Sequence, residues 1–280
     1  MAKRIAAKIL VIKIGTSVLT GEGNSLDTDI IKDITEQVAE IKKNGFAVII
    51  VTSGAIVVGM QLLHLNKRPE YLPEIQACAA IGQAQLMKIY DDHFKKVKLT
   101  TAQVLLTQDD INDRTRYLNA RNTMLALLEK DVIPIVNEND TVSTEEIKFG
   151  DNDRLSSLVA NLIEAQKLII MSDVEGLYKF DKKDKTKKEI IQRVERITDE
   201  IESQHRPHHD AVCYAMRNME LRTNRIRKCV HGCHAGIGEW HCQIGRPLRH
   251  VLLPVFRGEC EVHRGQGRAR GRDDPSNPDR

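Results

Sequence analysis

Short polar side chains and glycines follow the apolar runs of this sequence, at the points where those runs end. One such stretch, VNENDTVSTEEIKFGDND at 136–153, holds three Asn, three Asp and three Glu. Two others are Gly-Thr-Ser at 15–17 and Thr-Ser-Gly-Ala at 52–55, and Lys13 stands just before the first of them. Glycines let a phosphate approach backbone N–H groups, and a lysine can neutralise its charge. This combination of residue types suits phosphoryl transfer.

Each motif also has a simpler interpretation. The two glycine-containing motifs can be plain turns, and Asp140, Asn152 and Asp153 can be turn residues or a helix cap. Lys13 can extend to the surface, although a buried ammonium requires an anionic partner. The sequence has no G-x-x-x-x-G-K-[ST] run and no G-x-G-x-x-G run, which argues against a P-loop enzyme and a dinucleotide fold. The joint placement of the motifs is what favours a site.

Apolar runs alternate with patterns of helical spacing along this part of the chain. Strands are predicted where the apolar runs are continuous, at 8–14, 46–51, 102–106, 132–136 and 167–171. Helices are predicted between them, at 26–44, 74–94, 116–129 and 153–164. This alternation is typical of a mostly parallel sheet covered on both faces, so we expect an α/β fold, a three-layer αβα sandwich. Ligands bind such sheets at the carboxyl ends of the strands, where the polar motifs would meet.

The composition predicts a soluble globular protein, because 41% of the 280 residues are apolar and 29% are charged. The apolar run at 9–14 is too short to span a bilayer and no cleavage site follows it, so neither a membrane span nor a signal peptide is expected. We therefore expect a cytoplasmic protein. The net charge of +3 suggests no nucleic-acid partner, although it combines −3 over residues 1–204 with +6 over residues 205–280.

Five strings stand in order along the sequence and together carry a family resemblance. They are VIKIGTSVLT (11–20), IIVTSGAIVVG (49–59), LLTQDDINDRTRYLNARNT (105–123), VIPIVNENDTVSTEEIKFGDND (132–153) and SDVEGLY (172–178). These strings resemble the glutamate 5-kinases, a branch of the amino acid kinase family, over about residues 8–200. The NAR string and the NEND…GDND pair separate this branch from relatives that act on acetylglutamate, aspartate, UMP or carbamate.

The resemblance implies ATP-dependent phosphorylation of the side-chain carboxylate of L-glutamate. The product would be L-glutamyl 5-phosphate, at the head of proline biosynthesis. Glutamate binding would fall to the residues that match the family's substrate positions, Ser53, Asp140 and Asn152. Two catalytic residues are implied as well: Lys13, which would bridge the phosphates, and Asp153, which would orient the catalytic lysines.

The resemblance also places the nucleotide beside the first and last predicted strands. Ser172 and Asp173 resemble the pair that contacts the nucleotide, and Gly15 belongs to the turn that would approach the phosphates. The substrate oxygen is already anionic, so no strong base is required, and Mg²⁺ and lysine would offset the growing negative charge. Feedback inhibition by proline and a homo-oligomeric state are further family traits, and neither a membrane nor a nucleic-acid partner is expected.

The sequence departs from this family after residue 204. We expect an amino acid kinase domain at 1–204, which ends within the nucleotide-binding half, and a Cys-, His- and Arg-rich segment at 205–280. The family's Gly-rich loop, G-T-G-G-M-x-T-K, holds ATP phosphates and does not occur in that segment. A sheet without its last strands would expose apolar edges and bind the phosphates only in part. Weak or no kinase turnover is therefore predicted.

Three interpretations of residues 205–280 stay open. A zinc site is conceivable, although the cysteine spacing matches no well-defined motif. A basic tail could bind nucleic acid, although few aromatic residues accompany its arginines. An out-of-frame translation beginning near codon 204 fits the abrupt change of composition best. The alternatives to a glutamate kinase are another amino acid kinase or a catalytically inactive, kinase-derived protein with a basic or zinc-binding tail. The zinc candidates are Cys229, His231, Cys233, His234, His241 and Cys242.

Overall fold

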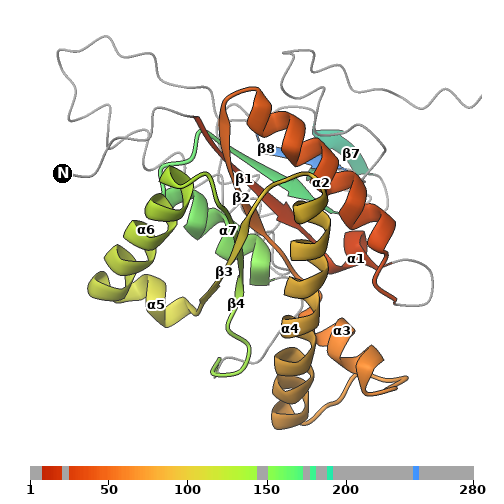
Figure 1. Ribbon diagram of the computed structural model, residues 1–280. Helices are drawn as coiled ribbons and strands as arrows, with labels where there is room; N and C mark the ends of the chain where they lie inside the picture. Colours follow the sequence, from red (N-terminus) through yellow and green to blue (C-terminus); the bar gives the residue numbers. More distant parts are fainter. Residues whose placement is uncertain are drawn as a thin grey trace, which may run out of the picture.

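A sheet of six parallel strands forms the centre of the protein (Figure 1). The computed structural model describes residues 8–20, 25–143, 151–172, 177–180, 188–191 and 242–245. The strand order is β3-β4-β2-β1-β5-β8, so β1 lies inside the sheet between β2 and β5. The strands are β1 (Lys8–Ile14), β2 (Phe46–Val51), β3 (Thr101–Leu106), β4 (Ile133–Glu138), β5 (Lys167–Met171) and β8 (Cys242–Gly245). Two further strands, β6 (Leu177–Phe180) and β7 (Lys188–Ile191), form a separate antiparallel pair.

Helices cover both faces of this sheet (Figure 1). One layer consists of α1 (Thr16–Leu19), α2 (Thr28–Lys43), α3 (Ala55–Leu62) and α4 (Leu72–Lys96). The other consists of α5 (Gln108–Asn112), α6 (Arg114–Glu129) and α7 (Asp151–Leu162). The prediction of an α/β fold with three layers is therefore confirmed.

The alternation of side chains along each strand explains why two cores form. In β1, Leu10, Ile12 and Ile14 pack into the core shared with α2 and α4. Ile9 and Val11, which alternate with them, pack into the core shared with α6 and α7. Successive side chains of a strand point to opposite faces, so a continuous apolar run fills both cores at once. The same alternation sends Lys13 toward the α7 layer, a direction on which the site depends.

Two glycines let α3 and α4 touch backbone to backbone. A Cβ atom at Gly82 would lie 1.8 Å from the carbonyl oxygen of Ala55, and one at Gly59 would lie 1.8 Å from that of Cys78. Both distances are far inside van der Waals contact. Gly54, which precedes α3, has a φ of +96°, a left-handed conformation that favours glycine. The loop after β2 is therefore held tightly against the start of α4.

Most predicted elements agree with the structure. The strands predicted at 8–14, 46–51 and 167–171 match β1, β2 and β5 residue for residue. The strand predicted at 132–136 instead runs to Glu138, because Asn137 and Glu138 continue the parallel pairing with β3. Helix α3 was not predicted, because its nearly all-apolar sequence AIVVGMQL follows a strand with no helical periodicity to separate them.

One strand of the sheet, β8, comes from residues 205–280, the segment that was not expected to continue the sheet. Strand β8, within residues 205–280, pairs in parallel with residues Leu168 to Met171 of β5. The prediction of an open apolar edge is therefore wrong at this side of β5. The residues proposed for a zinc site lie outside the described residues, apart from the backbone of Cys242.

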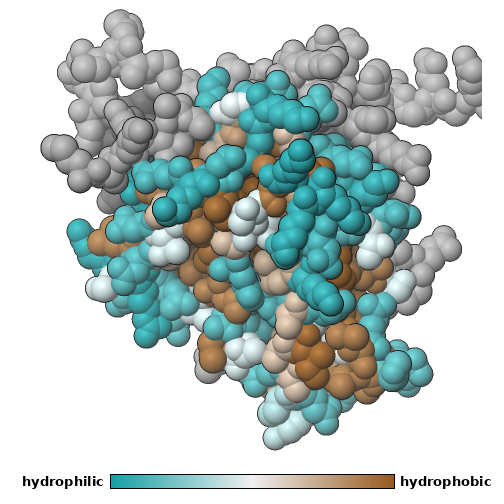
Figure 2. Space-filling view, in the orientation of Figure 1, coloured by the Kyte–Doolittle hydropathy of each residue, from teal (hydrophilic) through white to brown (hydrophobic). Residues whose placement is uncertain are grey.

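Apolar side chains are exposed at the far end of the α3 and α4 pair. Figure 2 shows them as a brown region over the lower part of these helices. Leu62, Leu63 and Leu65 are 41–49% exposed, and Tyr71 is 66% exposed. Within the described ranges, no helix combines the length and the apolar character that crossing a membrane would require.

Replacing Gly82 by alanine tests the close packing of α3 and α4. The added methyl group would collide with the Ala55 carbonyl, so we expect Gly82→Ala to lower the free energy of unfolding by about 1–3 kcal/mol. Urea denaturation measures this change. The control is Ala84→Ser on the same helix, an exposed position where the change should stay within about 0.5 kcal/mol. Equal stabilities of the two variants would contradict the packing argument.

Candidate active site

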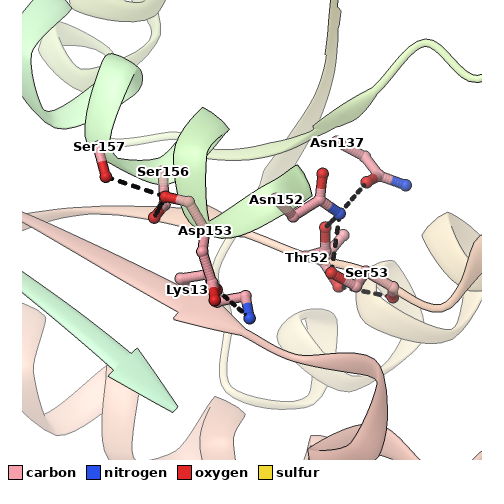
Figure 3. Close-up of polar contacts among 8 residues, drawn as sticks. All are labelled: Lys13, Thr52, Ser53, Asn137, Asn152, Asp153, Ser156 and Ser157. Carbon is pink, nitrogen blue, oxygen red and sulfur yellow. Dashed lines mark hydrogen bonds and ion pairs between the residues drawn. The ribbon is translucent and has the colours of Figure 1, made fainter. Parts of the chain in front are cut away.

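The candidate site lies at the carboxyl ends of β1, β2 and β4, under the first turn of α7 (Figure 3). Lys13 reaches it from β1, Ser53 follows β2, and Asn152 and Asp153 belong to α7. Four residues that the sequence singled out are therefore close together, although 140 positions separate the first of them from the last. Parallel strands produce this convergence, because their carboxyl ends share one edge of the sheet.

Lys13 and Asp153 form an ion pair at this edge, in which the lysine side chain is 8% exposed and the aspartate side chain 21% exposed. Lys13 is only 6% exposed, so the alternative that it extends to the surface is wrong. Its side chain points to the α7 face of the sheet, as the alternation along β1 requires, and meets the carboxylate of Asp153 there (Figure 3). A charge in this position needs its partner, because a buried ammonium left alone is strongly destabilising.

The main chain of Asp153 is held as firmly as its side chain. Its carbonyl oxygen accepts hydrogen bonds from the hydroxyls of Ser156, at 2.6 Å, and Ser157, at 2.9 Å. Both serines are fully buried. These contacts brace the first turn of α7, so the carboxylate of Asp153 has a defined position over the end of β1.

Asn152 joins the loops after β2 and β4. Its Nδ2 group donates toward the carbonyl oxygen of Thr52 at 2.7 Å, Ser53 Oγ at 2.8 Å and Asn137 Oδ1 at 3.0 Å (Figure 3). Two amide hydrogens are therefore shared among three acceptors. The amide oxygen of Asn152 points away from these three partners (Figure 3). Because Ser53 Oγ accepts here, its own hydrogen stays available as a donor.

Two further contacts tie the strand ends to α4. Asn137 Nδ2 donates to Gln83 Oε1 at 2.8 Å, and the Thr52 hydroxyl lies 2.9 Å from the hydroxyl of Tyr90. Tyr90 is fully buried, and this burial raises the pKa of its phenol. The phenol therefore stays neutral and acts as a fixed hydrogen-bonding group beneath the loop.

The turn after β1 carries no side chain at Gly15, where it passes Lys13. The backbone N–H of Gly15 donates to the carbonyl of Met171 at 3.1 Å, which ties this turn to the end of β5. A Cβ at Gly15 would lie 3.2 Å from Lys13 Nζ and 3.3 Å from that carbonyl, so a side chain would crowd the ammonium. A small residue beside a buried lysine fits the approach of a phosphate. Ser172 directly follows β5 at this edge, and Asp173 lies outside the described residues.

Asp140 lies apart from the ion pair, on the α4 side of the site. It lines a shallow hollow, open to solvent, between α4 and the loop after β4. Gln83 also lines this hollow and connects it through Asn137 to Asn152. The predicted site residues thus form two neighbouring groups, with Lys13 and Asp153 in one and Asp140 in the other. The residues that line the hollow are Ala79, Gln83, Leu105, Glu138, Asn139, Asp140 and Thr141.

Sequence reasoning missed three residues of this arrangement. Asn137 lies at the end of β4, and its place in the polar motif at a strand end is the signal that could have identified it. Gln83 and Tyr90 lie on α4, where no feature of the sequence distinguishes them. Gln83 and Tyr90 reach the strand ends only because of the way α4 packs on the sheet, and the sequence does not show that packing.

Comparisons with known proteins show which family this chain resembles in sequence. Residues 8–223 match the model of the amino acid kinase family. Over 176 residues the chain is 52% identical to a glutamate 5-kinase of Herminiimonas arsenicoxydans, covering 63% of this chain and 47% of that protein. Over 204 residues it is 47% identical to a glutamate 5-kinase of Geobacter sp. (strain M21), covering 72% and 55%. The chain spans about half the length of these curated relatives.

A solved structure shares the fold. The carbamate kinase from Giardia lamblia bound to AMP-PNP superposes with a TM-score of 0.58 over 91% of this chain and 97% of that one. The two sequences are 14% identical, so this likeness concerns the fold alone.

A double-mutant cycle tests the ion pair between Lys13 and Asp153. We expect Lys13→Met and Asp153→Asn each to destabilise the protein, with a coupling energy of about 1–3 kcal/mol, because each variant leaves one buried charge without its partner. Urea denaturation measures the free energy of unfolding of the unmodified chain, the two single variants and the double variant.

The matched control is a cycle on the exposed pair of Lys32 and Glu36, using Lys32→Met and Glu36→Gln. These side chains are each 57% exposed and 4.0 Å apart, so their coupling should stay below about 0.5 kcal/mol. Additive effects at Lys13 and Asp153, similar to those of the control, would show that the buried pair carries no special interaction.

Proposed function

Because this chain belongs to the amino acid kinase family, we propose that it transfers the γ-phosphoryl group of ATP to the side-chain carboxylate of L-glutamate. The product is L-glutamyl 5-phosphate, the first intermediate of proline biosynthesis. Relatives that are 47–52% identical and named glutamate 5-kinase support this assignment. The proposal concerns the activity of the whole protein, since the chain spans about half the length of those relatives.

The observation that carries the proposal is the adjacency of Asn152 and Asp153 on α7. Asn152 organises the polar loops after β2 and β4, while Asp153 holds the ammonium of Lys13. One helical turn thus joins a group of amides and hydroxyls, suited to an amino acid, to a cation suited to phosphates. A kinase for a small carboxylate needs these two functions side by side.

The chemistry asks little of the protein beyond alignment and charge. A carboxylate oxygen of the substrate attacks the γ-phosphorus, and the bond from that phosphorus to the bridging oxygen of ADP breaks. The nucleophile is already anionic, so no general base is needed. In this proposal, Lys13 neutralises the phosphate oxygens and Asp153 holds it in position. Bound Mg²⁺ would supply additional positive charge at the β- and γ-phosphates.

Substrate binding is proposed for Ser53, Asn152 and Asp140. Ser53 has a hydroxyl hydrogen available for a carboxylate, and the amide oxygen of Asn152, which points away from the three partners of its Nδ2 group, can accept from an ammonium. Asp140 lines the neighbouring hollow, where its carboxylate suits the ammonium of an amino acid. The nucleotide is proposed to contact Gly15, with Ser172 and Asp173, the second of which lies outside the described residues.

The segment after residue 204 lowers the activity that we propose for this chain. It lacks the family's Gly-rich phosphate loop, so we propose that the kinase domain ends near residue 204. Because part of the phosphate site is then missing, we also propose that the kinase reaction is slow. An out-of-frame translation near codon 204 explains the change of composition. Resequencing the gene and translating all three frames tests this. A Gly-rich loop in another frame is the expected result, and its absence from every frame would reject the frameshift.

Three further properties belong to the proposal because the family resemblance supports them. They are feedback inhibition by proline, a homo-oligomeric state and a cytoplasmic location. Proline would compete with glutamate for a site that recognises an amino acid, and light scattering of the purified chain would measure the oligomeric state.

Calorimetry and acyl-phosphate trapping test the proposed function. We expect the 280-residue chain to bind L-glutamate and, with ATP and Mg²⁺, to form a hydroxamate slowly when hydroxylamine is present. Ser53→Ala should weaken glutamate binding about tenfold, because a hydrogen bond to a charged group is lost, and should leave ATP binding unchanged.

Exposed Ser25 provides the matched control, since Ser25→Ala should change neither affinity. Preference for L-aspartate, N-acetyl-L-glutamate, carbamate or UMP over L-glutamate would assign the chain to another kinase of the family. Binding of zinc or nucleic acid without any of these substrates would favour the catalytically inactive alternative.

A further inference from the structure

Gln83 is a buried polar residue to which the proposed reaction assigns no role. It lies on α4 and is 9% exposed. At its neighbour Gly82, α4 packs directly against the backbone of α3 at Ala55. Gln83 itself contacts Asn137, near the end of β4.

Hydrogen bonds to backbone groups fix which way each amide of the site points. Asn152 Nδ2 faces the carbonyl oxygen of Thr52, which can only accept. Asn137 Oδ1 accepts from the backbone N–H of Glu138 at 2.9 Å, which can only donate. Asn137 must therefore present its Nδ2 group to Gln83, whose Oε1 accepts it at 2.8 Å. The Nε2 group of Gln83 is consequently turned away from Asn137.

This Nε2 group is buried and has no hydrogen-bond partner among the residues that the structure describes. A buried donor without a partner is unfavourable by about 1–3 kcal/mol and is uncommon in folded proteins. Gln83 and Asp140 both line the same hollow, which is open to solvent. The residue that carries the unused donor is therefore also part of the wall of the hollow.

We propose that Gln83 Nε2 donates a hydrogen bond to the α-carboxylate of the amino-acid substrate, making Gln83 a specificity-determining residue. This inference rests on the proposed function and deepens it by orienting the substrate. The ammonium and α-carboxylate lie in the hollow, between Asp140 and Gln83. The side-chain carboxylate extends toward Ser53 and Lys13.

The charge of the hollow explains why a neutral amide serves here. Asp140 and Glu138 both line it, so it attracts an ammonium and repels an isolated anion. A lysine or arginine in place of Gln83 would pair with these carboxylates and occupy the ammonium's site. An amide donor accepts no proton and forms no ion pair, so the site keeps its affinity for a zwitterion. The bond from Asn137 to Gln83 also links an occupied hollow to Asn152, beside the catalytic pair.

Binding of two ligands to the full 280-residue chain tests this role. L-Glutamate carries the α-carboxylate, whereas L-isoglutamine carries an α-carboxamide in its place. We expect the unmodified chain to bind L-glutamate at least about tenfold more tightly, as measured by calorimetry. In Gln83→Glu the acceptor for Asn137 is kept but the donor is lost, so the preference should fall to about onefold or reverse. ATP affinity should not change.

Gln85→Glu, the same substitution two residues along α4 and outside the hollow, is the matched control and should keep the full preference. Gln83→Met, an uncharged variant of similar length, decides the question if Gln83→Glu does not fold. An unchanged preference in a folded Gln83 variant overturns the inference and leaves the proposed function standing. Failure of the unmodified chain to bind L-glutamate overturns the proposed function, and this inference with it.

Discussion

The buried ammonium of Lys13 is the constraint on which the rest of the site depends. Lys13 lies on β1, between β2 and β5 in the sheet, and water cannot solvate its charge there. Asp153 must therefore lie over the end of β1, which fixes the first turn of α7 and places Asn152 above the loop after β2. A helix that satisfies one charge also positions the polar group beside it. An incoming phosphate would meet this cation next to the turn at Gly15, where a side chain would take up the space.

The alternation of side chains along the strands places the ion pair of Lys13 on one face of the sheet and the amides and hydroxyls of the site on the other. Lys13 shares the α7 face of the sheet with Ile9 and Val11, whose side chains pack beneath that helix. The polar residues after β2 and at the end of β4 turn toward α4 instead, where Tyr90 and Gln83 meet them. The site thus lies where the two helical layers meet at one edge of the sheet. Asn152 spans that boundary, because it projects from α7 and bonds to the loops on the α4 side.

Sequence alone predicted the sheet type and five of its strands, because these depend on local apolar patterns. The lysine inside the apolar run of β1 is visible without a structure, whereas Asp153 was singled out through the family resemblance, and the structure brings the two side chains together. Gln83 was not predictable, since a glutamine on a helix acquires meaning only when Gly82 brings that helix into backbone contact with α3. Strand β8 was missed for a related reason, because its pairing with β5 depends on tertiary context rather than on a clear apolar pattern.

The direction of hydrogen bonding through the site determines what kind of ligand the hollow accepts. Asn152 donates a hydrogen bond to the amide oxygen of Asn137, and the amide nitrogen of Asn137 donates to the oxygen of Gln83. This series of hydrogen bonds therefore ends in the amide nitrogen of Gln83, which is a donor. Its direction is set where Asn152 donates to the main-chain carbonyl of Thr52. Reversing any one amide would leave two acceptors or two donors face to face. The donor that we propose for a carboxylate therefore owes its direction to the backbone at the ends of β2 and β4, through hydrogen bonds that Asn152 and Asn137 extend to α4.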